Sequence, residues 1–225
     1  MRIEALAGRG KWFAGLPPPL RAALLREGRV VRREAGQWVY GQGDARAGVV
    51  LVLKGLLRIE ASVGDARDVL VNLAPAGTAF GQSRRGGGGP RIATVRAASA
   101  ATVLLVTDDA LERIAHDHVA LWRHVGELVY DQLDAMVRLA AHLLALGPRQ
   151  RIAARLLALA GDDVVRATQA DLAEMCGLSR RVANAHLAAL EAAGLIERRY
   201  RRIAIRDAAG LRRFVAGAED SQKTG

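Results

Sequence analysis

Residues 168–184 read TQADLAEMCGLSRRVAN, and this stretch decides how the C-terminal part of the chain folds. Thr168 and Ser179 can each cap the start of a helix, because their hydroxyls accept hydrogen bonds from free backbone N–H groups. The stretch therefore predicts two short helices joined by a tight turn at residues 176–178. The second helix opens with two consecutive arginines. Two helices in this arrangement can place side chains against base edges in the DNA major groove.

The second helix, which Gly194 is expected to end, has two distinct faces. Arg180, Arg181 and Asn184 share the outward face. Arg can bond guanine, and Asn can bond adenine, in bidentate fashion. We expect Arg180 and Asn184 to contact bases and Arg181 to contact a base or a phosphate. The alternative is that the arginines only solvate a surface helix. The apolar face, which would pack on the preceding helix, carries Val182, Ala183, Leu187 and Leu190.

A basic hairpin follows, with the sequence Arg198-Arg199-Tyr200-Arg201-Arg202, and completes a predicted winged helix-turn-helix. Residues 149–213 hold thirteen arginines and seven acidic residues, a local charge of +6 in a chain of net charge +10. Compositional drift would not concentrate charge there, so a polyanionic partner is favoured. Wing arginines would meet phosphates or only be solvated. The DNA-binding residues that we predict are Thr168, Gln169, Ser179, Arg180, Arg181, Asn184, Arg199 and Arg201.

Residues 29–106 differ in sequence pattern from the C-terminal part of the chain, because they consist of short Val, Leu and Ile runs separated by glycines. Runs at residues 49–53 and 102–106 are examples. Many short strands with glycine turns predict a β-roll or jelly-roll barrel. A buried parallel sheet is less favoured, because no helical segments alternate with the strands. Residues 1–28 have helical character that Pro17–Pro19 interrupts.

Residues 108–146 predict one long helix, because no proline interrupts them and apolar residues recur at steps of three and four. One face forms a heptad seam, and a second, with Leu121, Leu128 and Ala135, would lie on the barrel. A helix that lies only on its own barrel is the alternative, but two apolar faces favour a homodimer, with Gln132 fixing the register. The predicted dimer seam comprises Trp122, Val125, Val129, Gln132, Met136, Leu139 and Leu143.

The predicted fold is α+β, in three parts. Residues 1–107 form a β-roll or jelly-roll sensor barrel, residues 108–146 the dimerisation helices, and residues 147–225 the winged helix-turn-helix domain, with Gly147-Pro148 at the boundary.

This order resembles the cyclic-AMP receptor protein / fumarate-nitrate regulator (CRP/FNR) family through nearly the whole chain. The order and spacing of the matching residues are more specific than any single motif. In the barrel they are Gly43-Asp44, Gly55, Gly77, Phe80-Gly81 and Arg91-x-Ala93-x-Val95. In the C-terminal part they are Arg151-Ile152-Ala153, Leu156-Leu157-x-Leu159, Asp171-Leu172-Ala173, Gly177-x-Ser179-Arg180 and Leu187-x-x-Leu190-x-x-x-Gly194-Leu195-Ile196.

The resemblance implies a cyclic-nucleotide-binding-like domain, but the effector site departs from the family pattern. Members that bind cyclic AMP carry Gly-Glu, then Arg-Ser or Arg-Thr, in a phosphate cassette, and a Thr-Ser pair on the long helix. Here Arg91 is kept, Gln82 replaces Glu, Ile92 has no hydroxyl, and Met136-Val137 takes the place of the pair. We expect no tight cyclic-AMP binding, although Gln82 can still accept a hydrogen bond from a hydroxyl. The effector-binding positions implied are Gly81, Gln82, Arg91, Ile92, Met136 and Val137.

Two positions of the second helix also depart from the family pattern. Ala185 stands where members commonly carry a second arginine, and Arg181 stands where many have Glu. The operator is therefore expected to differ from the usual family half-site.

No cofactor is expected. The single cysteine, Cys176, excludes a cysteine-ligated iron–sulfur cluster, and no histidine spacing supports haem. No Ser-His-Asp order, metal-ligand spacing or phosphate-binding loop suggests an enzyme. No apolar run is long enough to span a membrane and no signal peptide is evident, so we expect a cytoplasmic protein.

The expected partners are double-stranded DNA with a near-palindromic operator, a second copy of this chain, and RNA polymerase if the regulator is an activator. The rival hypothesis is a nucleotide or other small-molecule sensor module in which DNA binding is secondary. A helix bundle used only for assembly would not need thirteen arginines around a helix-turn-helix.

Overall fold

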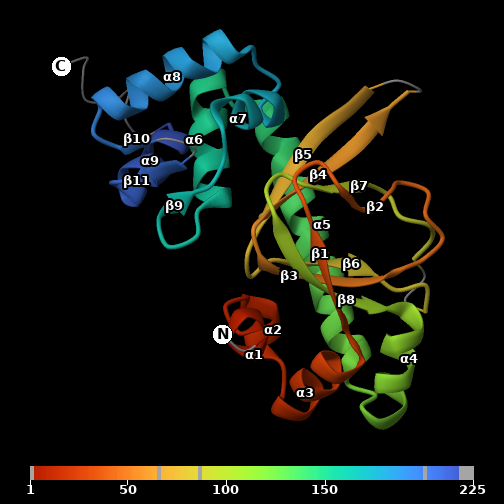
Figure 1. Ribbon diagram of the computed structural model, residues 1–225. Helices are drawn as coiled ribbons and strands as arrows, with labels where there is room; N and C mark the ends of the chain where they lie inside the picture. Colours follow the sequence, from red (N-terminus) through yellow and green to blue (C-terminus); the bar gives the residue numbers. More distant parts are fainter. Residues whose placement is uncertain (1–2, 65–66, 86–87, 200–201, 218–225) are drawn as a thin grey trace. The chain divides into compact units, whose positions relative to one another are not determined.

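The computed structural model describes residues 3–64, 67–85, 88–199 and 202–217 (Figure 1). The chain forms two compact units, residues 1–135 and 136–225. The division between the two units falls inside α5 (Leu121–Ala145). The domain boundary predicted from the sequence, Gly147-Pro148, lies at the junction between α5 and α6 (Pro148–Leu159). No described helix combines the length and the apolar character that a bilayer crossing requires.

Where the structure describes it, the first unit contains two four-stranded antiparallel sheets, which agree with the predicted β-roll. Their strand orders are β1-β8-β3-β6 and β2-β7-β4-β5. The first sheet comprises β1 (Arg29–Arg33), β8 (Ala101–Thr107), β3 (Gly48–Lys54) and β6 (Ala79–Gln82). The second comprises β2 (Trp38–Tyr40), β7 (Thr94–Ala97), β4 (Leu56–Val63) and β5 (Arg67–Pro75).

Strand β3 explains why the barrel sequence contains unbroken apolar runs. Val50 and Val52 point into the core between the two sheets. Val49 and Leu51 point the other way, into a second core under the helices. A strand that is buried on both faces has no polar alternation, so periodicity alone could not show which face each residue occupies.

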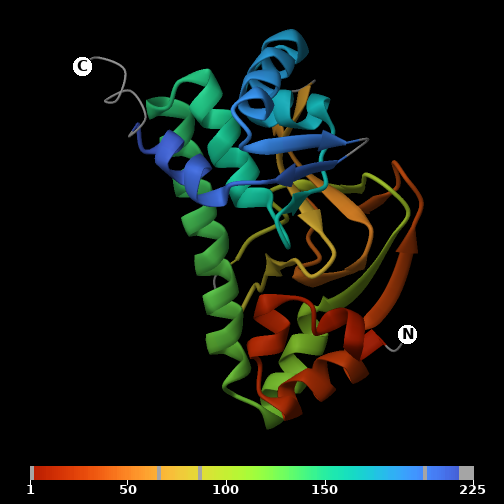
Figure 2. The same cartoon turned by 90° about the vertical axis from the view of Figure 1, so that its left-hand side faces the viewer.

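Five helices cover the outer face of the first sheet within the described residues (Figure 2). The first three are α1 (Ile3–Ala7), α2 (Lys11–Gly15) and α3 (Pro18–Glu27). Pro18 occupies the first turn of α3, where its missing N–H costs no helical hydrogen bond.

Residues 108–146 form two helices, so the prediction of a single one is wrong. Helix α4 spans Asp108–Asp117 and α5 spans Leu121–Ala145. His118, with φ −135° and ψ 68°, leaves the helical conformation, and its carbonyl accepts a hydrogen bond from the Leu121 N–H at 2.9 Å. The break lets Ile114 of α4 and Val125 of α5 pack into one core, which a continuous helix would not allow.

Helix α5 turns two of the three predicted barrel-facing residues to the barrel, together with part of the predicted seam. The predicted barrel-facing residues Leu121 and Leu128 are buried, whereas Ala135 is exposed. Val125 is also buried in this core, and Trp122 packs against it. Val125 is therefore not free to form a seam, and its assignment is wrong, whereas the assignment of the partly buried Trp122 stays a prediction.

The exposed apolar stripe of α5 lies one residue further along the chain. Tyr130 is 69% exposed, Leu133 57%, Val137 59% and Leu144 89%. Each follows directly after a predicted seam residue. Val129, Met136 and Leu143 lie beside the stripe and are 42%, 37% and 38% exposed, and Leu139 is half-buried.

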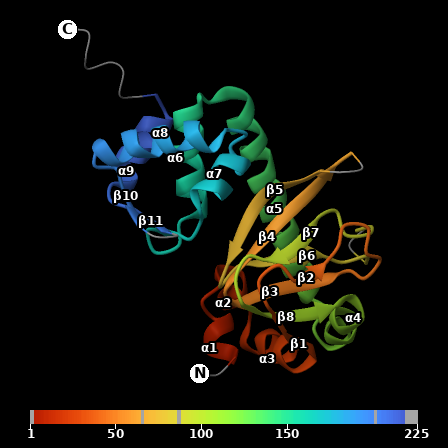
Figure 3. The same cartoon turned by 45° about the horizontal axis from the view of Figure 1, so that its top comes forward.

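The described part of the second unit contains four further helices and a three-stranded antiparallel sheet of order β10-β11-β9 (Figure 3). Ile152, Leu156, Leu172 and Leu187 are fully buried in this unit. The helices are α6 (Pro148–Leu159), α7 (Gln169–Met175), α8 (Arg180–Ala192) and α9 (Ala208–Val215). The strands are β9 (Val164–Val165), β10 (Ile196–Arg199) and β11 (Arg202–Ile205).

Candidate nucleic-acid interface and sensor site

Helix α7 begins with the capping box that the sequence predicts. The Thr168 hydroxyl donates to Asp171 Oδ2 at 2.7 Å and accepts from the Asp171 N–H at 3.1 Å. The Thr168 N–H also donates to Asp171 Oδ2, at 2.9 Å. These bonds satisfy N–H groups that the helix leaves free. They also occupy the Thr168 hydroxyl, which leaves Gln169 as the more available residue at this helix start.

A tight turn then joins α7 to α8. Gly177 has φ +64°, a conformation that glycine adopts without a Cβ clash. The Leu178 N–H bonds the Ala173 carbonyl at 2.9 Å, which closes the turn. Ser179 caps α8 by accepting from the Val182 N–H at 3.3 Å. Because Ser179 is exposed, its hydroxyl proton remains free to meet a phosphate.

Helix α8 presents its arginines to solvent and its leucines to the core. Leu187 and Leu190 are 0% exposed, as is Ala183. Arg180 and Arg181 are exposed at the first turn. Asn184 is half-buried, and its Oδ1 atom has no hydrogen-bond partner within the described part of the chain. It is therefore less open to a ligand than the two arginines.

Strands β10 and β11 form the predicted hairpin, with Glu197 opposite Ala204 in the register. The exposed Arg199 donates through Nε to Glu197 Oε1 at 2.6 Å, and Arg206 pairs with the same carboxylate. Part of the Arg199 charge is therefore neutralised within the wing. Arg201, the other wing residue predicted to bind DNA, lies outside the described residues.

Glu191, which the sequence did not single out, ties α8 to the wing. Its Oε1 atom accepts from the Arg198 N–H at 2.7 Å, and its Oε2 atom accepts from Arg198 Nε at 2.7 Å. The backbone N–H of Arg198, and then its guanidinium, lower the pKa of the Glu191 carboxyl. The pair is seven residues apart across a turn, so helical spacing gives no sign of it.

In the first unit, the Arg91 side chain donates hydrogen bonds to the protein's own backbone. Its side chain is 4% exposed and donates to the carbonyls of Arg46 at 3.0 Å and Gly48 at 2.8 Å. Its guanidinium also lies over the Tyr40 ring, 4.1 Å from the ring centroid. Burial lowers the pKa of Arg91 and raises that of Tyr40 to about 12. The contacts of the Arg91 guanidinium are thus with carbonyls and an aromatic ring.

The other predicted effector residues differ in their local contacts. Gln82 donates through Nε2 to the carbonyls of Gly89 at 2.7 Å and Pro90 at 3.1 Å, so it closes the loop that leads to Arg91. Ile92 is 79% exposed. Gly81 is bonded to the side chain of Gln132 on α5. Met136 and Val137 are exposed on α5 and belong to the second unit.

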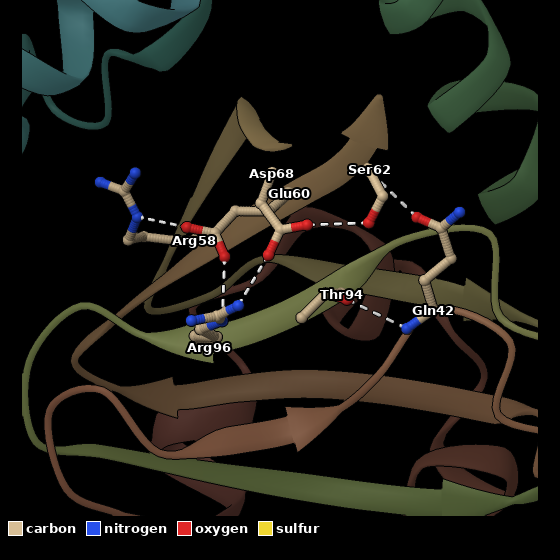
Figure 4. Close-up of polar contacts among 7 residues, drawn as sticks. All are labelled: Gln42, Arg58, Glu60, Ser62, Asp68, Thr94 and Arg96. Carbon is tan, nitrogen blue, oxygen red and sulfur yellow. Dashed lines mark hydrogen bonds and ion pairs between the residues drawn. The ribbon is translucent and has the colours of Figure 1, made fainter. Parts of the chain in front are cut away.

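A charged network links the strands of the second sheet (Figure 4). Glu60 on β4 pairs with Arg58 at 2.8 Å and with Arg96 of β7 at 3.1 Å. Arg96 also reaches Asp68 of β5 at 2.7 Å, and Ser62 bonds the same carboxylate at 2.8 Å. Two arginines and two carboxylates balance one another, so the network stabilises the sheet and leaves no excess charge for a ligand.

Cys176 is buried beside Arg155 and Arg151, and burial raises its thiol pKa to about 11. The thiol is therefore neutral at physiological pH. Among the residues that the structure describes, no group of three His, Cys, Asp or Glu side chains could hold a metal ion.

Two family models match the chain, in the order that the fold displays. Residues 30–118 match a cyclic nucleotide-binding domain, and residues 137–214 match a Crp-like helix-turn-helix domain. No match is found among curated proteins.

Similar solved structures include FixK2 from Bradyrhizobium japonicum, with a TM-score of 0.71 and 21% identity over 82% of this chain and 96% of that one. A CooA mutant from Carboxydothermus hydrogenoformans has a TM-score of 0.68 and 21% identity over 85% and 89% of the two chains. TTHB099, a transcriptional regulator of the CRP family from Thermus thermophilus, has a TM-score of 0.63 and 26% identity over 83% and 96%.

The matched domains and their order agree with the β-roll, the long helix and the exposed arginines of α8. The chain belongs to the CRP/FNR family and is a DNA-binding transcription regulator.

Proposed function

We propose that this regulator reads a near-palindromic operator as a homodimer, with a sensor barrel that does not respond to cyclic AMP. The observation that carries the DNA-reading part is the first turn of α8. Arg180 and Arg181 are exposed there, while Ala183, Leu187 and Leu190 anchor the helix from behind. A buried anchoring face and an open basic face are what a helix needs to enter the major groove.

Arg180 is the residue proposed to read a base, and Arg181 is proposed to contact a base or a phosphate. Both lack a carboxylate partner in the described part of the chain, so no internal ion pair has to break before they bind. Asn184 would add a base contact through its amide. Gln169, Ser179 and Arg199 are proposed to hold phosphates, with Thr168 and Arg201 as further candidates.

The test of base reading is Arg180→Ala on an array of duplexes. We expect a loss of about 1–3 kcal/mol on the best site and a flattened preference at one base step of each half-site. Arg29→Ala removes the same charge from exposed strand β1 and serves as the control. An equal loss on every sequence would contradict base reading by Arg180.

The homodimer is supported by the exposed stripe of α5. Tyr130, Leu133, Val137 and Leu144 follow steps of three, four and seven residues, which suit the seam of a two-helix coiled coil. Dimers of helix-turn-helix proteins bind half-sites one helical turn apart, about 34 Å. Contact with RNA polymerase is proposed if the regulator activates transcription.

The proposal on cyclic AMP is supported by the contacts of Arg91 and Gln82. A phosphate would have to draw a 4% exposed guanidinium away from two carbonyls and an aromatic ring. The amide of Gln82 already holds the loop carbonyls of Gly89 and Pro90. Titration calorimetry with cyclic AMP should therefore show no micromolar binding.

The match of residues 30–118 to a cyclic nucleotide-binding domain favours a second candidate function. In that case the barrel would sense a nucleotide or another small molecule, and DNA binding would be secondary. Micromolar binding in the same titration would support this alternative over a silent sensor.

A further inference from the structure

The side chain of Gln132 completes the open edge of a β-sheet. Strand β6 is an edge strand of its sheet, and α5 runs past it (Figures 1 and 3). The Gly81 N–H donates to Gln132 Oε1 at 3.1 Å, and Gln132 Nε2 donates to the Gly81 carbonyl at 3.0 Å. The amide therefore takes both backbone groups that Gly81 presents on this side, as a neighbouring strand would.

The same contact restricts how α5 can rotate about its own axis. Gln132 Nε2 also donates to the Leu128 carbonyl of its own helix at 3.0 Å, which holds the side chain against α5. A helix fixed at Gln132 turns Leu133 and Val137 away from the barrel, because successive residues are about 100° apart around a helix of 3.6 residues per turn. This is the stripe that is exposed.

Gly81 suits this close contact for a steric reason. It has φ +134°, and a Cβ at this position would collide with the Gly48 carbonyl on the neighbouring strand β3. The next residue, Gln82, holds the loop carbonyls of Gly89 and Pro90. Two adjacent residues of β6 thus bond Gly89 and Pro90 on one side and α5 on the other.

We propose that Gln132 is the positioning residue that joins the sensor barrel to the dimerisation helix and selects which face of α5 forms the seam. This inference rests on the proposed homodimer. A displacement of β6 would be passed to α5 through the Gly81–Gln132 pair, which makes this pair a direct connection between strand β6 and the dimer seam.

The experiment compares two seam registers by disulfide cross-linking. In a Cys176→Ala background, one variant carries Leu133→Cys and another carries Val129→Cys. Two cysteines form a disulfide only when their Cα atoms lie within about 7 Å, so cross-linking reports which position lies at the seam. In the parent dimer, Leu133→Cys should cross-link several-fold more than Val129→Cys.

Adding Gln132→Ala to each cysteine variant should make the cross-linking yields of Leu133→Cys and Val129→Cys more nearly equal. It should also accelerate hydrogen exchange at the Gly81 amide, which NMR measures. Gln132→Glu is the second variant, because it keeps the shape and the acceptor but loses the donor to the Gly81 carbonyl. Gln150→Ala removes a helical glutamine from α6 and is the matched control, which should change neither readout.

The outcomes separate the inference from the proposed function. A parent dimer whose cross-linking preference survives both Gln132 variants would overturn the role of Gln132 and leave the homodimer standing. Faster exchange at Gly81 with an unchanged preference would also overturn it. A parent chain that sediments as a monomer would overturn the homodimer and this inference together.

Discussion

At the scale of single residues, Glu191 shows how one carboxylate joins α8 to the wing. Its two oxygens bind the backbone and the guanidinium of Arg198. The sequence shows Glu191 only as one of many surface acids, because its partner follows after the helix has ended. The contact depends on the turn at Gly194, where the chain reverses with φ +73°.

The Glu191 pair predicts a pH dependence. The pKa of Glu191 is lowered from its ordinary value of 4.5 in the folded state. Its contribution to the free energy of unfolding is therefore present above that value and lost as pH falls through the lowered pKa. Glu191→Gln should be less stable than the parent at neutral pH, with the difference shrinking in acid. Urea unfolding of the parent and of Glu191→Gln, from neutral to acid pH, measures this difference in stability. A difference that stays constant with pH would contradict a stabilising role of the ionised Glu191 carboxylate.

Thr168 gives a second prediction at this scale, because its hydroxyl both donates to and accepts from Asp171. Thr168→Ala should lower the free energy of unfolding by about 1 kcal/mol, since the helix start loses its cap. Thr168→Ser keeps the hydroxyl and is the matched control. Equal losses for Ala and Ser in urea titrations would show that the methyl group, and not the cap, is what matters.

At the scale of elements, α5 carries two apolar faces on one helix. Its barrel face runs from Leu121 through Val125 and Leu128 to Gln132. Its open face carries Tyr130, Leu133 and Val137. A helix that is apolar on both sides fits more than one heptad assignment, so the choice between adjacent registers needs the position of the barrel.

The two faces predict opposite effects of the same substitution. Leu133→Asp should leave the fold intact, because Leu133 is 57% exposed, but should dissociate the dimer by placing like charges at the seam. Leu128→Asp should unfold the first unit, because Leu128 is 3% exposed and an unpaired carboxylate would be buried. Sedimentation and circular dichroism distinguish the two results. A dimer that tolerates Leu133→Asp would rule out this seam.

At the scale of the whole molecule, positive charge is unevenly distributed along the chain. The chain carries +10 overall, and the segment 149–213 holds thirteen arginines against seven acids. In the first unit, arginines such as Arg58 and Arg96 form ion pairs with carboxylates. At the start of α8 the arginines are exposed. The excess positive charge therefore includes the surface proposed to face the nucleic acid.

This charge placement predicts a salt dependence. The logarithm of the DNA-binding constant should fall linearly with the logarithm of the salt concentration, with a slope of about −0.9 for each phosphate that is neutralised. If Arg181 holds a phosphate, Arg181→Ala should reduce the slope by about one unit on all sequences, while Arg180→Ala leaves it nearly unchanged. Fluorescence anisotropy over a salt series measures both. A slope that neither substitution alters would place the phosphate contacts elsewhere.

Local chemistry made much of this protein predictable from its sequence. Helix caps at Thr168 and Ser179, the glycine that ends α8 and the basic hairpin each act over a few residues, so short stretches reveal them. The short glycine-separated runs indicated the β-roll for the same reason. The order of the two domains then followed from reading these signals along the chain.

Contacts between residues far apart in the chain decided the rest, because side chains choose partners that the sequence does not place beside them. The break between α4 and α5 follows from packing both helices on one core. Arg91 is buried and donates to the carbonyls of Arg46 and Gly48, which lie more than forty residues away in sequence. Gln132 of α5 meets Gly81 at the edge of β6, 51 residues away in sequence. Only the folded chain brings these groups within bonding distance.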